Sequence, residues 1–393
     1  MYLRPSEETG KLRQELRRYF EALLTNEVRA ELRAEGAAGG PTRSRVLRQM
    51  GSDGWLGIGW PAEFGGQDKG PDAQYVLFDE SYRAGAPLPM VTLTTVAPTL
   101  MAKGSQKQKD YFLPRILRGE LIFAIGYTEP TAGTDLASLR TRAVRDGDEY
   151  VINGNKVFTS GASGADWIWL AARTDPEAPK HKGISLILVP TSSEGFSATP
   201  IHTVGRGTTT ATYYDDVRVP VTNVVGQENR GWEMITTQLN HERIGLAAFS
   251  GVCEGMLDDT LEWARQRTTT DGRPMIDLPW VGTRLAESYA RTRAMQLMNW
   301  QLVDATREQS ALPGDASAAK VFATETAIDV YRALLEVRGA SAMRITDQPW
   351  RIDSGRLALM NLSAQINTFG GGVAEVQREI VAWSRLEMAR RTK

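Results

Sequence analysis

The clearest pattern of apolar and polar positions in the chain lies between residues 231 and 267. Apolar side chains recur there at alternating steps of three and four, which is the period of an amphipathic α-helix with one buried stripe. The stripe consists of Ile235, Leu239, Leu246, Phe249, Cys253 and Met256. The step from 239 to 246 omits one place, and the residue in that place is Glu242. The pattern predicts one long helix that carries a carboxylate on its buried face.

Glu242 admits two interpretations, because carboxylates are almost never fully buried unless they are paired. In the structural interpretation, Glu242 lies at the edge of the stripe and bonds an arginine of the next helix. In the functional interpretation, it transfers a proton beside an apolar ligand cavity, where desolvation raises its pKa into a useful range. The helical pattern alone leaves both interpretations open.

The N-terminal third of the chain is patterned as helices separated by Gly and Pro. A strongly charged run begins at Ser6, and Ser105 has the position of an N-cap for the last run. The predicted helices span about 6–35, 41–53, 72–85, 89–103 and 106–118. The segment 54–66 contains too much glycine for a helix, so we expect a structured loop there.

From about residue 121 to 225 the pattern changes to that of β-strands. The segments alternate apolar and polar positions and are rich in β-branched and aromatic residues. Asp146-Gly147 and Asn153-Gly154 are signals for tight turns between such strands. The helical period then returns, with runs near 232–267, 279–309, 315–338 and 352–389. Four long helices of this kind predict a bundle.

The order of these patterns predicts an α+β protein with three domains, which a chain of 393 residues is long enough to form. We expect an N-terminal α-helical domain over residues 1–120. A central antiparallel, β-barrel-like domain follows over 121–230. A C-terminal four-helix bundle covers 231–393.

Composition narrows the range of functions. The net charge is −1, so nothing favours nucleic acid or a membrane surface as a partner. A single cysteine, Cys253, excludes an internal disulfide framework and is typical of a protein of the reducing cytoplasm. The charged N-terminus predicts no signal peptide, and no apolar run is long enough to span a bilayer. The three histidines lie far apart without metal-ligand spacing, so we expect no metal site.

Four motifs occur in the order of a known family. They read GWPAEFGG (59–66), YTEPTAGTDLASL (127–139), NGNKVFTSGAS (153–163) and YYDDVRVP (213–220). With the domain order, they make the chain resemble the acyl-CoA dehydrogenases along almost its entire length. The resemblance implies an FAD cofactor and removal of hydrogen across the α,β bond of an acyl-CoA thioester. That reaction needs a base for the α proton, donors that hold the thioester carbonyl, and a flavin that accepts the β hydride at N5.

The resemblance also assigns residues to the cofactor. The implied cofactor-binding positions are Ile125, Tyr127, Thr128, Gly133, Phe158 and Ser160. Phe158 stands where the family usually has a tryptophan against the isoalloxazine ring, and Ser160 matches the residue that bonds near flavin N5. Thr134 stands where a serine touches the CoA arm of the substrate. Residue types alone favour ordinary turn chemistry for Thr128 and Thr134 and a core position for Phe158, and only the whole motif favours the cofactor roles.

The family uses two positions for the catalytic base. The commoner position lies in a C-terminal segment that reads TFGGGVAEVQ (368–377) here, and Gly371 takes the place of the base. The other position, in members that resemble the isovaleryl-CoA type, is a Glu followed by Arg on the first helix of the C-terminal bundle. Glu242-Arg243 matches it, so we expect Glu242 to be the base. Asn240 and Arg243 match substrate-binding positions that meet the CoA portion or hold the helix junction.

The chain departs from the family where a neighbouring subunit would complete the flavin site. Arg267 of that contribution is retained and is expected to bind cofactor, but Thr270 replaces a phenylalanine. A glutamine near the adenine is replaced around Pro279. Glu336 stands for a glutamine near the flavin phosphates, where a carboxylate is repulsive. The residues expected to bind this chain's own flavin therefore match the family. Several of the residues expected to complete a neighbouring subunit's flavin site do not.

This asymmetry resembles the actinobacterial heterotetrameric dehydrogenases of steroid side-chain breakdown, in which two related chains pair. The resemblance implies a paralogous partner subunit, a steroid side-chain CoA thioester such as one from cholesterol degradation, and an electron-transferring flavoprotein as acceptor. Three alternatives stay open at this point. They are a homotetrameric dehydrogenase of short or branched acyl-CoA, a catalytically silent subunit that completes a partner's flavin site, and an oxidase that uses oxygen directly.

Overall fold

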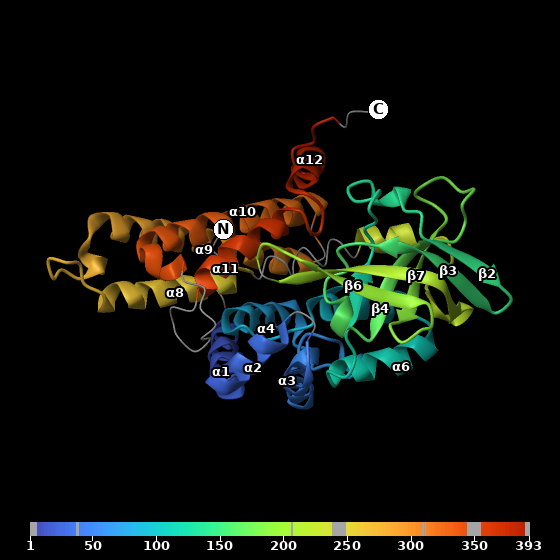
Figure 1. Cartoon of the computed structure of the whole chain (residues 1–393), viewed down its shortest axis with the longest axis horizontal. Coiled ribbons are helices and arrows are strands. Elements are labelled where there is room, and N and C mark those ends of the chain that lie inside the picture. The colour runs from blue at the N-terminus through green and yellow to red at the C-terminus, as the bar shows by residue number, and fades with distance from the viewer. Residues whose placement is uncertain are drawn as a thin grey trace.

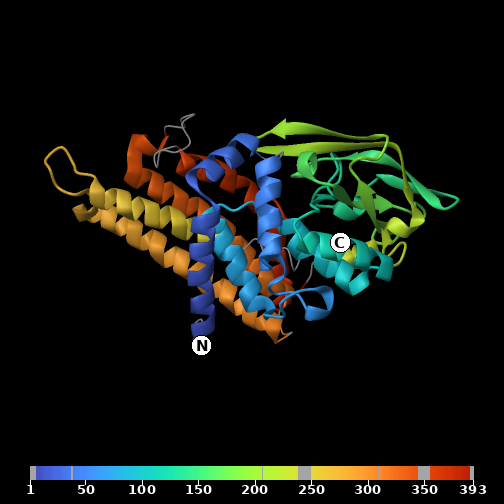
Figure 2. The same cartoon turned by 90° about the horizontal axis from the view of Figure 1, so that it is seen from below.

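Helical segments precede and follow the β region along the chain, and in Figure 1 the long C-terminal helices lie to the left of the β region. The computed structural model describes residues 6–36, 39–205, 207–237, 249–308, 310, 312–343 and 355–389. Seen from below, the N-terminal helices lie across the junction between the β region and the C-terminal bundle (Figure 2). The α+β architecture predicted from the sequence pattern is confirmed.

The N-terminal region is helical, with one break that the sequence pattern did not predict. Its α-helices are α1 (Glu7–Leu23), α2 (Asn26–Glu35), α3 (Pro41–Ser52), α4 (Gly70–Ala84), α5 (Ala97–Lys103) and α6 (Gln106–Leu117). The prediction of one helix over 6–35 is wrong, because Thr25 caps a second helix by accepting a hydrogen bond from the Val28 amide at 3.4 Å. The predicted N-cap Ser105 is confirmed, and it forms a capping box with Gln108.

Two irregular segments connect these helices. The glycine-rich segment 54–66 contains the short 3-10 helices Trp55–Gly57 and Ala62–Phe64. The predicted helix over 89–103 contains a π-helical stretch, Thr92–Val96, directly before α5. The Thr92 hydroxyl accepts a hydrogen bond from the Phe123 amide at 2.9 Å. The π-helix is thereby fixed to the first strand of the sheet.

The β region is one mixed sheet. Its strands are β1 (Phe123–Gly126), β2 (Arg142–Asp146), β3 (Glu149–Lys156), β4 (Trp167–Arg173), β5 (Ile184–Pro190), β6 (Phe196–His202), β7 (Thr208–Pro220) and β8 (Val224–Val225). Their order is β6-β7-β3-β2-β4-β5-β8, with β1 beside β4. The pairing is antiparallel as predicted, except that β1 and β2 pair with β4 in parallel. β6 is a strand that the sequence pattern did not predict.

Only one of the two predicted turns is a turn between strands. Asp146-Gly147 connects β2 and β3 as expected, with Gly147 at φ 63°. Asn153-Gly154 lies within β3, where the register shifts between residues 152 and 154. A Cβ at Gly154 would lie 2.6 Å from the Thr141 hydroxyl oxygen. Glycine is therefore needed at this position, because the segment that contains Thr141 approaches the β3 backbone closely.

Strand β4 shows why the sheet positions the site rigidly. Its side chains alternate between two cores, because Ile168 and Leu170 pack within the β region while Trp169 and Ala171 pack against the N-terminal helices. All four are fully buried. A strand that is covered on both faces exposes little apolar surface to water and is tightly packed. The ends of the neighbouring strands are therefore held in fixed positions.

The C-terminal helices are α8 (Ser250–Gln266), α9 (Pro279–Arg307), α10 (Pro313–Arg338), α11 (Arg356–Ala364) and α12 (Ala374–Ser384). The predicted helix near 352–389 is wrong as a single element, because a 3-10 turn at 365–368 and a glycine-rich loop separate α11 from α12. The predicted helix over 231–267 is helical at 231–237 and 250–266, and residues 238–248 lie outside the described part. Within the stripe, Ile235, Cys253 and Met256 are buried as expected.

A buried charge network joins the N-terminal region to the start of α8. Asp79 and Glu80 on α4 are fully buried, and Arg13 on α1 donates to both carboxylates, at 2.6 Å to Asp79. Arg17 donates to Glu80 at 2.9 Å, and Ser250 donates to Asp79 at 2.9 Å. Buried carboxylates are tolerated because both are paired and hydrogen-bonded. The first turn of α8 is therefore fixed against α4.

Candidate active site

A buried ion pair shapes the loop that follows β1. Lys156, at the end of β3, has no exposed surface and donates to the Glu129 carboxylate at 2.8 Å and to the Tyr127 carbonyl at 3.0 Å. Glu129 also accepts the amides of Arg140 at 2.7 Å and Thr141 at 2.8 Å. One side chain thus organises both ends of the motif 127–139, and Lys156 closes the loop from the other strand.

The electrostatics of this pair follow from its burial. Burial lowers the pKa of Lys156 to about 8, although the Glu129 charge opposes the change. Burial also acts to raise the pKa of Glu129, but the Lys156 charge and the hydrogen bonds it accepts outweigh burial, so the pKa of Glu129 falls below its usual range. Glu129 is therefore a carboxylate that stays ionised, which suits a structural role better than proton transfer.

A second turn, at residues 158–160, follows the end of β3 and lies beside the loop that follows β1. Phe158 adopts φ 59°, a left-handed conformation that is unusual for a bulky residue, and its side chain is 60% exposed. The Ser160 amide bonds the Phe158 carbonyl at 2.9 Å, and the Thr159 amide bonds the Thr210 carbonyl at 2.9 Å. Strained, exposed aromatic residues that the surrounding structure holds in place are typical of ligand sites.

Hydrogen bonds bring the two turns together and link them to the C-terminal bundle. The Val157 amide donates to the Thr128 carbonyl at 2.9 Å, and the hydroxyls of Ser160 and Thr209 lie 2.9 Å apart. The turn between β6 and β7 reaches α11, where the Ser363 hydroxyl donates to the Gly205 carbonyl at 3.3 Å. Thr128, Phe158 and Ser160 therefore lie at one edge of the sheet, where the loop after β1 meets the turn after β3.

The remaining residues of the 125–134 motif contribute in different ways. Tyr127 points into the core, where its hydroxyl oxygen accepts the Trp169 indole N–H at 3.1 Å, so only its main chain faces the loop. Ile125 is half-buried on β1. Gly133 and Thr134 are exposed, and a Cβ at Gly133 would meet nothing nearer than the Thr128 methyl at 3.9 Å. The loop leaves open space where a ligand can approach its backbone.

Arg267 and Glu336, which the sequence assigns to a neighbouring subunit's flavin site, lie on the C-terminal helices. Arg267 ends α8, at the tip of the bundle that Figure 1 places opposite the β region. The turn after it is closed by the Thr269 amide, which bonds the Arg273 carbonyl at 2.8 Å. Glu336 forms an ion pair with Arg284 at 2.8 Å on the bundle surface. This chain does not bring Arg267 or Glu336 to its own 127–134 loop.

The loop at the family's commoner base position is formed by the main chain. Gly371 and Gly372 have φ 66° and 94°, and the Gly371 carbonyl accepts the Gln377 side-chain amide at 3.0 Å. Lys320 on α10, which is fully buried, donates to the carbonyls of Thr368 at 3.1 Å and Gly372 at 3.0 Å. The glycines at 370–372 bring no side chain to this loop.

Asn240, Glu242 and Arg243 lie outside the described residues. Their assignments as base and substrate contacts stay predictions.

Sequence reasoning missed the two lysines that fix these loops. A signal for Lys156 was present, because it falls on the same alternation as the buried Tyr150 and Ile152 of β3. Lys320 gave a similar signal, since it lies among the apolar and small residues of a helix. A lysine in an inward position is rarely buried without partners, so each should have prompted a search for acceptors.

The residues on the sheet edge fit a flavin. An exposed aromatic wall, hydroxyls at Thr128 and Ser160, and open space beside Gly133 provide the contacts that a planar heterocycle with a polar edge requires. Across the described ranges, no cluster of three or more His, Cys, Asp or Glu side chains is placed to hold a metal ion. No helix in those same ranges has the length and apolarity to cross a membrane.

Three family models match the chain from end to end. They are "Acyl-CoA dehydrogenase, N-terminal domain" over residues 6–120, "middle domain" over 124–217 and "C-terminal domain" over 229–385. These matches, together with the site geometry described above, identify a flavoenzyme of the dehydrogenase class. The chain belongs to the acyl-CoA dehydrogenase family, whose cofactor is FAD.

Relatives and solved structures agree with this assignment. Acyl-CoA dehydrogenases FadE26 and FadE29 of Mycobacterium tuberculosis are each 48% identical to the chain, covering 97% and 99% of it and the same shares of themselves. The structure titled "Tcur3481-Tcur3483 steroid ACAD" matches at TM-score 0.93 and 52% identity, covering 99% of this chain and 100% of that one. The ChsE4-ChsE5 complex from Mycobacterium tuberculosis matches at TM-score 0.92 and 47% identity, with the same coverage.

Proposed function

We propose that the chain is the catalytic subunit of a steroid acyl-CoA dehydrogenase, with Glu242 as the base that removes the α proton of a steroid side-chain CoA thioester. The carrying observation is the loop at Gly371, where the commoner base position holds a glycine whose carbonyl is bonded by Gln377. A glycine side chain cannot accept a proton, so a catalytic chain needs its base at another position. Glu242 is the carboxylate at the family's other base position.

The roles of the chain's residues follow from the chemistry. FAD, when bound, supplies the acceptor for the β hydride. Phe158 would form one wall of its site, and Thr128 and Ser160 would orient its polar edge through their hydroxyls. Thr134 would contact the CoA arm together with Asn240 and Arg243. Glu242 would take the α proton, and a positioned base contributes about 10²–10⁴ in rate.

The test is Glu242→Gln, which keeps the size of the side chain but removes its basicity. The variant should retain flavin and lose the bleaching of the flavin by a steroid side-chain acyl-CoA under anaerobic conditions. The control is Glu375→Gln, which removes the carboxylate nearest in sequence to Gly371 and should bleach normally. Normal bleaching by Glu242→Gln would refute the assignment of the base.

We also propose that a paralogous subunit completes the enzyme and that an electron-transferring flavoprotein reoxidises it in the cytoplasm. The support is the contrast between the intact edge at 127–160 and Glu336, which stands in the half-site lent to a neighbour. Retained Arg267 favours the alternative of a homotetramer. Native mass measurement of the chain, alone and co-expressed with its paralogue, decides between them when combined with the flavin-to-protein ratio. One flavin per chain in a homotetramer would overturn the paired assembly.

A further inference from the structure

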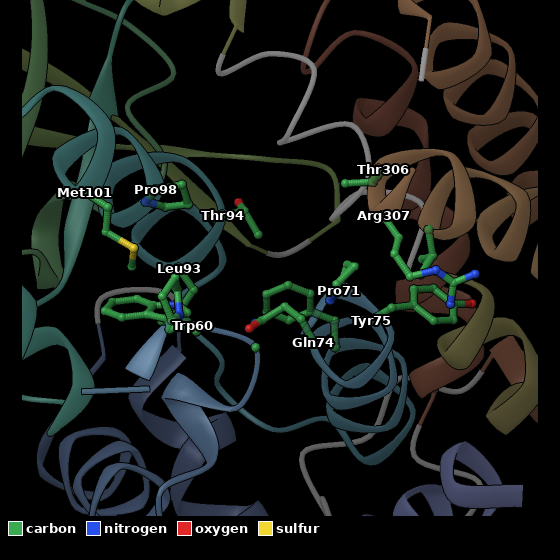
Figure 3. Close-up of a pocket in the computed structure, with 14 residues that line it drawn as sticks. Trp60, Pro71, Gln74, Tyr75, Leu93, Thr94, Pro98, Met101, Thr306 and Arg307 are labelled. Atoms are coloured by element: carbon green, nitrogen blue, oxygen red, sulfur yellow. The ribbon is translucent and has the colours of Figure 1, made fainter. Parts of the chain in front are cut away.

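A cavity of about 460 Å³ lies between α4, the π-helix with α5, the segment 59–61 and the C-terminal end of α9. Figure 3 shows its lining residues, with Gln74 near the middle of those labelled. Its walls are mostly apolar and are formed chiefly by Trp60, Tyr75, Phe78, Leu93, Pro98 and Met101. This volume falls in the range of about 300–1,000 Å³ that small-molecule sites occupy.

Gln74 is the unusual member of this lining. Both its carboxamide oxygen and its nitrogen are buried, and neither has a hydrogen-bond partner. A buried polar group without a partner costs about 1–3 kcal/mol, so a persistent one calls for an explanation. Gly59 leaves room for this side chain, because a Cβ there would lie 2.8 Å from the Gln74 Cβ and Oε1. An apolar side chain would fill the same space without the cost.

The charged group at the rim of the cavity is already neutralised. Arg307 pairs with Asp304 at 2.6 Å and with Asp72 at 3.3 Å. Among the lining residues that the structure describes, none offers an unpaired cation to a phosphate or a carboxylate. Its chemistry suits a compact apolar group that carries one oxygen with which the Gln74 amide can bond.

Two helices that line the cavity also contact the first residues of β1 and α8. Leu93 and Thr94 of its wall belong to the π-helix, and Thr92 in the same helix holds the start of β1. The Tyr75 hydroxyl lies 3.4 Å from the hydroxyl of Ser250, the first residue of α8. Short π-helical stretches frequently occur at functional sites. The Thr95 hydroxyl of this one is also buried without a partner.

We propose that this cavity receives the distal, polycyclic end of the acyl group and that the Gln74 carboxamide hydrogen-bonds an oxygen carried on that end. The inference rests on the proposed function, because it assigns the substrate of that same reaction. Gln74 is thus a specificity-determining residue. Its Nε2 donates to a ketone, and its Oε1 accepts from a hydroxyl.

The first experiment measures stability. Because Gln74 has no partner to lose, Gln74→Leu in the flavin-loaded protein should melt at or above the wild-type temperature. Gln108→Leu is the matched control, since Gln108 is buried and donates to the carbonyls of Thr222 and Val224 at 2.9 and 3.0 Å. Gln108→Leu should lower the melting temperature. A similar loss in Gln74→Leu would mean that the carboxamide is already satisfied, and the proposal fails.

The second experiment measures binding to the flavin-loaded protein by calorimetry. The probes are a fused bicyclic ketone (decalone) and its analogue with an exocyclic methylene in place of the oxygen. Wild type should bind the ketone about tenfold more tightly, since the analogue leaves the amide unpaired. Gln74→Leu should lose or reverse this preference. Equal binding of the two probes by wild type, or an unchanged preference in the variant, would overturn the assignment.

Failure of this inference is distinguishable from failure of the proposed function. If wild type is bleached by a steroid side-chain acyl-CoA but does not discriminate between the probes, only the cavity assignment is wrong. If it discriminates between the probes and no acyl-CoA bleaches it, the cavity assignment stands and the proposed function fails. Where both hold, decalone should raise KM for the thioester and leave kcat unchanged.

Discussion

Two loops of this protein are held by a fully buried lysine, and they differ in what the lysine binds. Lys156 pairs with the Glu129 carboxylate at 2.8 Å and holds the Tyr127 carbonyl of the loop after β1. Lys320 holds the carbonyls of Thr368 and Gly372 in the loop between α11 and α12. A carboxylate within the first loop supplies the counter-charge, whereas the second loop offers Lys320 main-chain carbonyl oxygens.

The difference matches what each loop can present to a ligand. The first loop keeps side chains with hydroxyls, such as Thr128 and Thr134, on a frame fixed by charge. The second loop contains three consecutive glycines, and two of them, Gly371 and Gly372, have a positive φ that other residues rarely adopt. A Cβ at Gly372 would lie 2.3 Å from the Gln377 Nε2. At Gly371, φ 66° would strain a glutamate by about 1–2 kcal/mol. The second loop therefore shapes space, and restoring a base there would work against its backbone.

Breaking the buried ion pair between Lys156 and Glu129 should have the largest effect on stability. Glu129→Gln leaves the Lys156 ammonium buried beside an amide, and the amide nitrogen cannot accept the backbone N–H groups of Arg140 and Thr141. The expected loss is about 3–5 kcal/mol of unfolding free energy. Denaturant unfolding, followed by fluorescence and by flavin retention, measures it.

A double variant and a surface control complete this test. Glu129→Gln combined with Lys156→Met should recover much of the loss, because a buried pair is often replaceable by apolar groups. Asp135→Asn removes the exposed partner of Lys180 at 2.9 Å, and it should change the unfolding free energy far less than Glu129→Gln does. A Glu129→Gln effect as small as that of Asp135→Asn would show that the pair does not hold the loop.

The sequence predicted the elements whose causes are local. The Ser105 cap, the Asp146-Gly147 turn and the strand β4 depend on residues within a few positions of one another. The break at Thr25 competed with a strong helical pattern on both sides and was missed. The bulge at Gly154 depends on Thr141, which approaches it from another segment, so no local pattern could reveal it.

The candidate site shows the same division. Resemblance assigned Thr128, Phe158 and Ser160 to one cofactor site, because contiguous motifs carry them. It did not show that the Tyr127 side chain is turned into the core against Trp169, since that depends on a contact 42 positions away along the chain. The unpaired carboxamide of Gln74 is likewise visible only when the side chains around it are placed.

Removing the Lys320 hydrogen bonds should have a smaller effect on stability than breaking the Lys156–Glu129 ion pair. Lys320→Met leaves the carbonyls of Thr368 and Gly372 without this donor, and a buried unsatisfied group costs about 1–3 kcal/mol. We expect a total loss of about 2–4 kcal/mol and faster amide exchange across 368–372. Lys11→Met, at an exposed lysine of α1, is the control and should change stability by less than about 0.5 kcal/mol. Unchanged amide exchange in Lys320→Met would mean that the glycines alone fix the loop.

The smallest effect per measured step is a pH dependence carried by Lys156, which changes the unfolding free energy gradually over the pH range and not in a single loss. Its pKa is about 8 in the folded protein and 10.5 ordinarily, so between these values the unfolded chain keeps a proton that the folded protein releases. Because the unfolded state binds more protons, the unfolding free energy of wild type should rise with pH over this window, by at most about 1.4 kcal/mol per unit. Lys156→Met lacks this contribution, and subtracting its unfolding free energy cancels the other titrating groups. The difference, wild type minus variant, should be flat below about pH 8 and increase toward pH 10.5. A difference that stays flat or falls would mean that Glu129 keeps the ammonium charged throughout, and that attraction within the pair outweighs its burial.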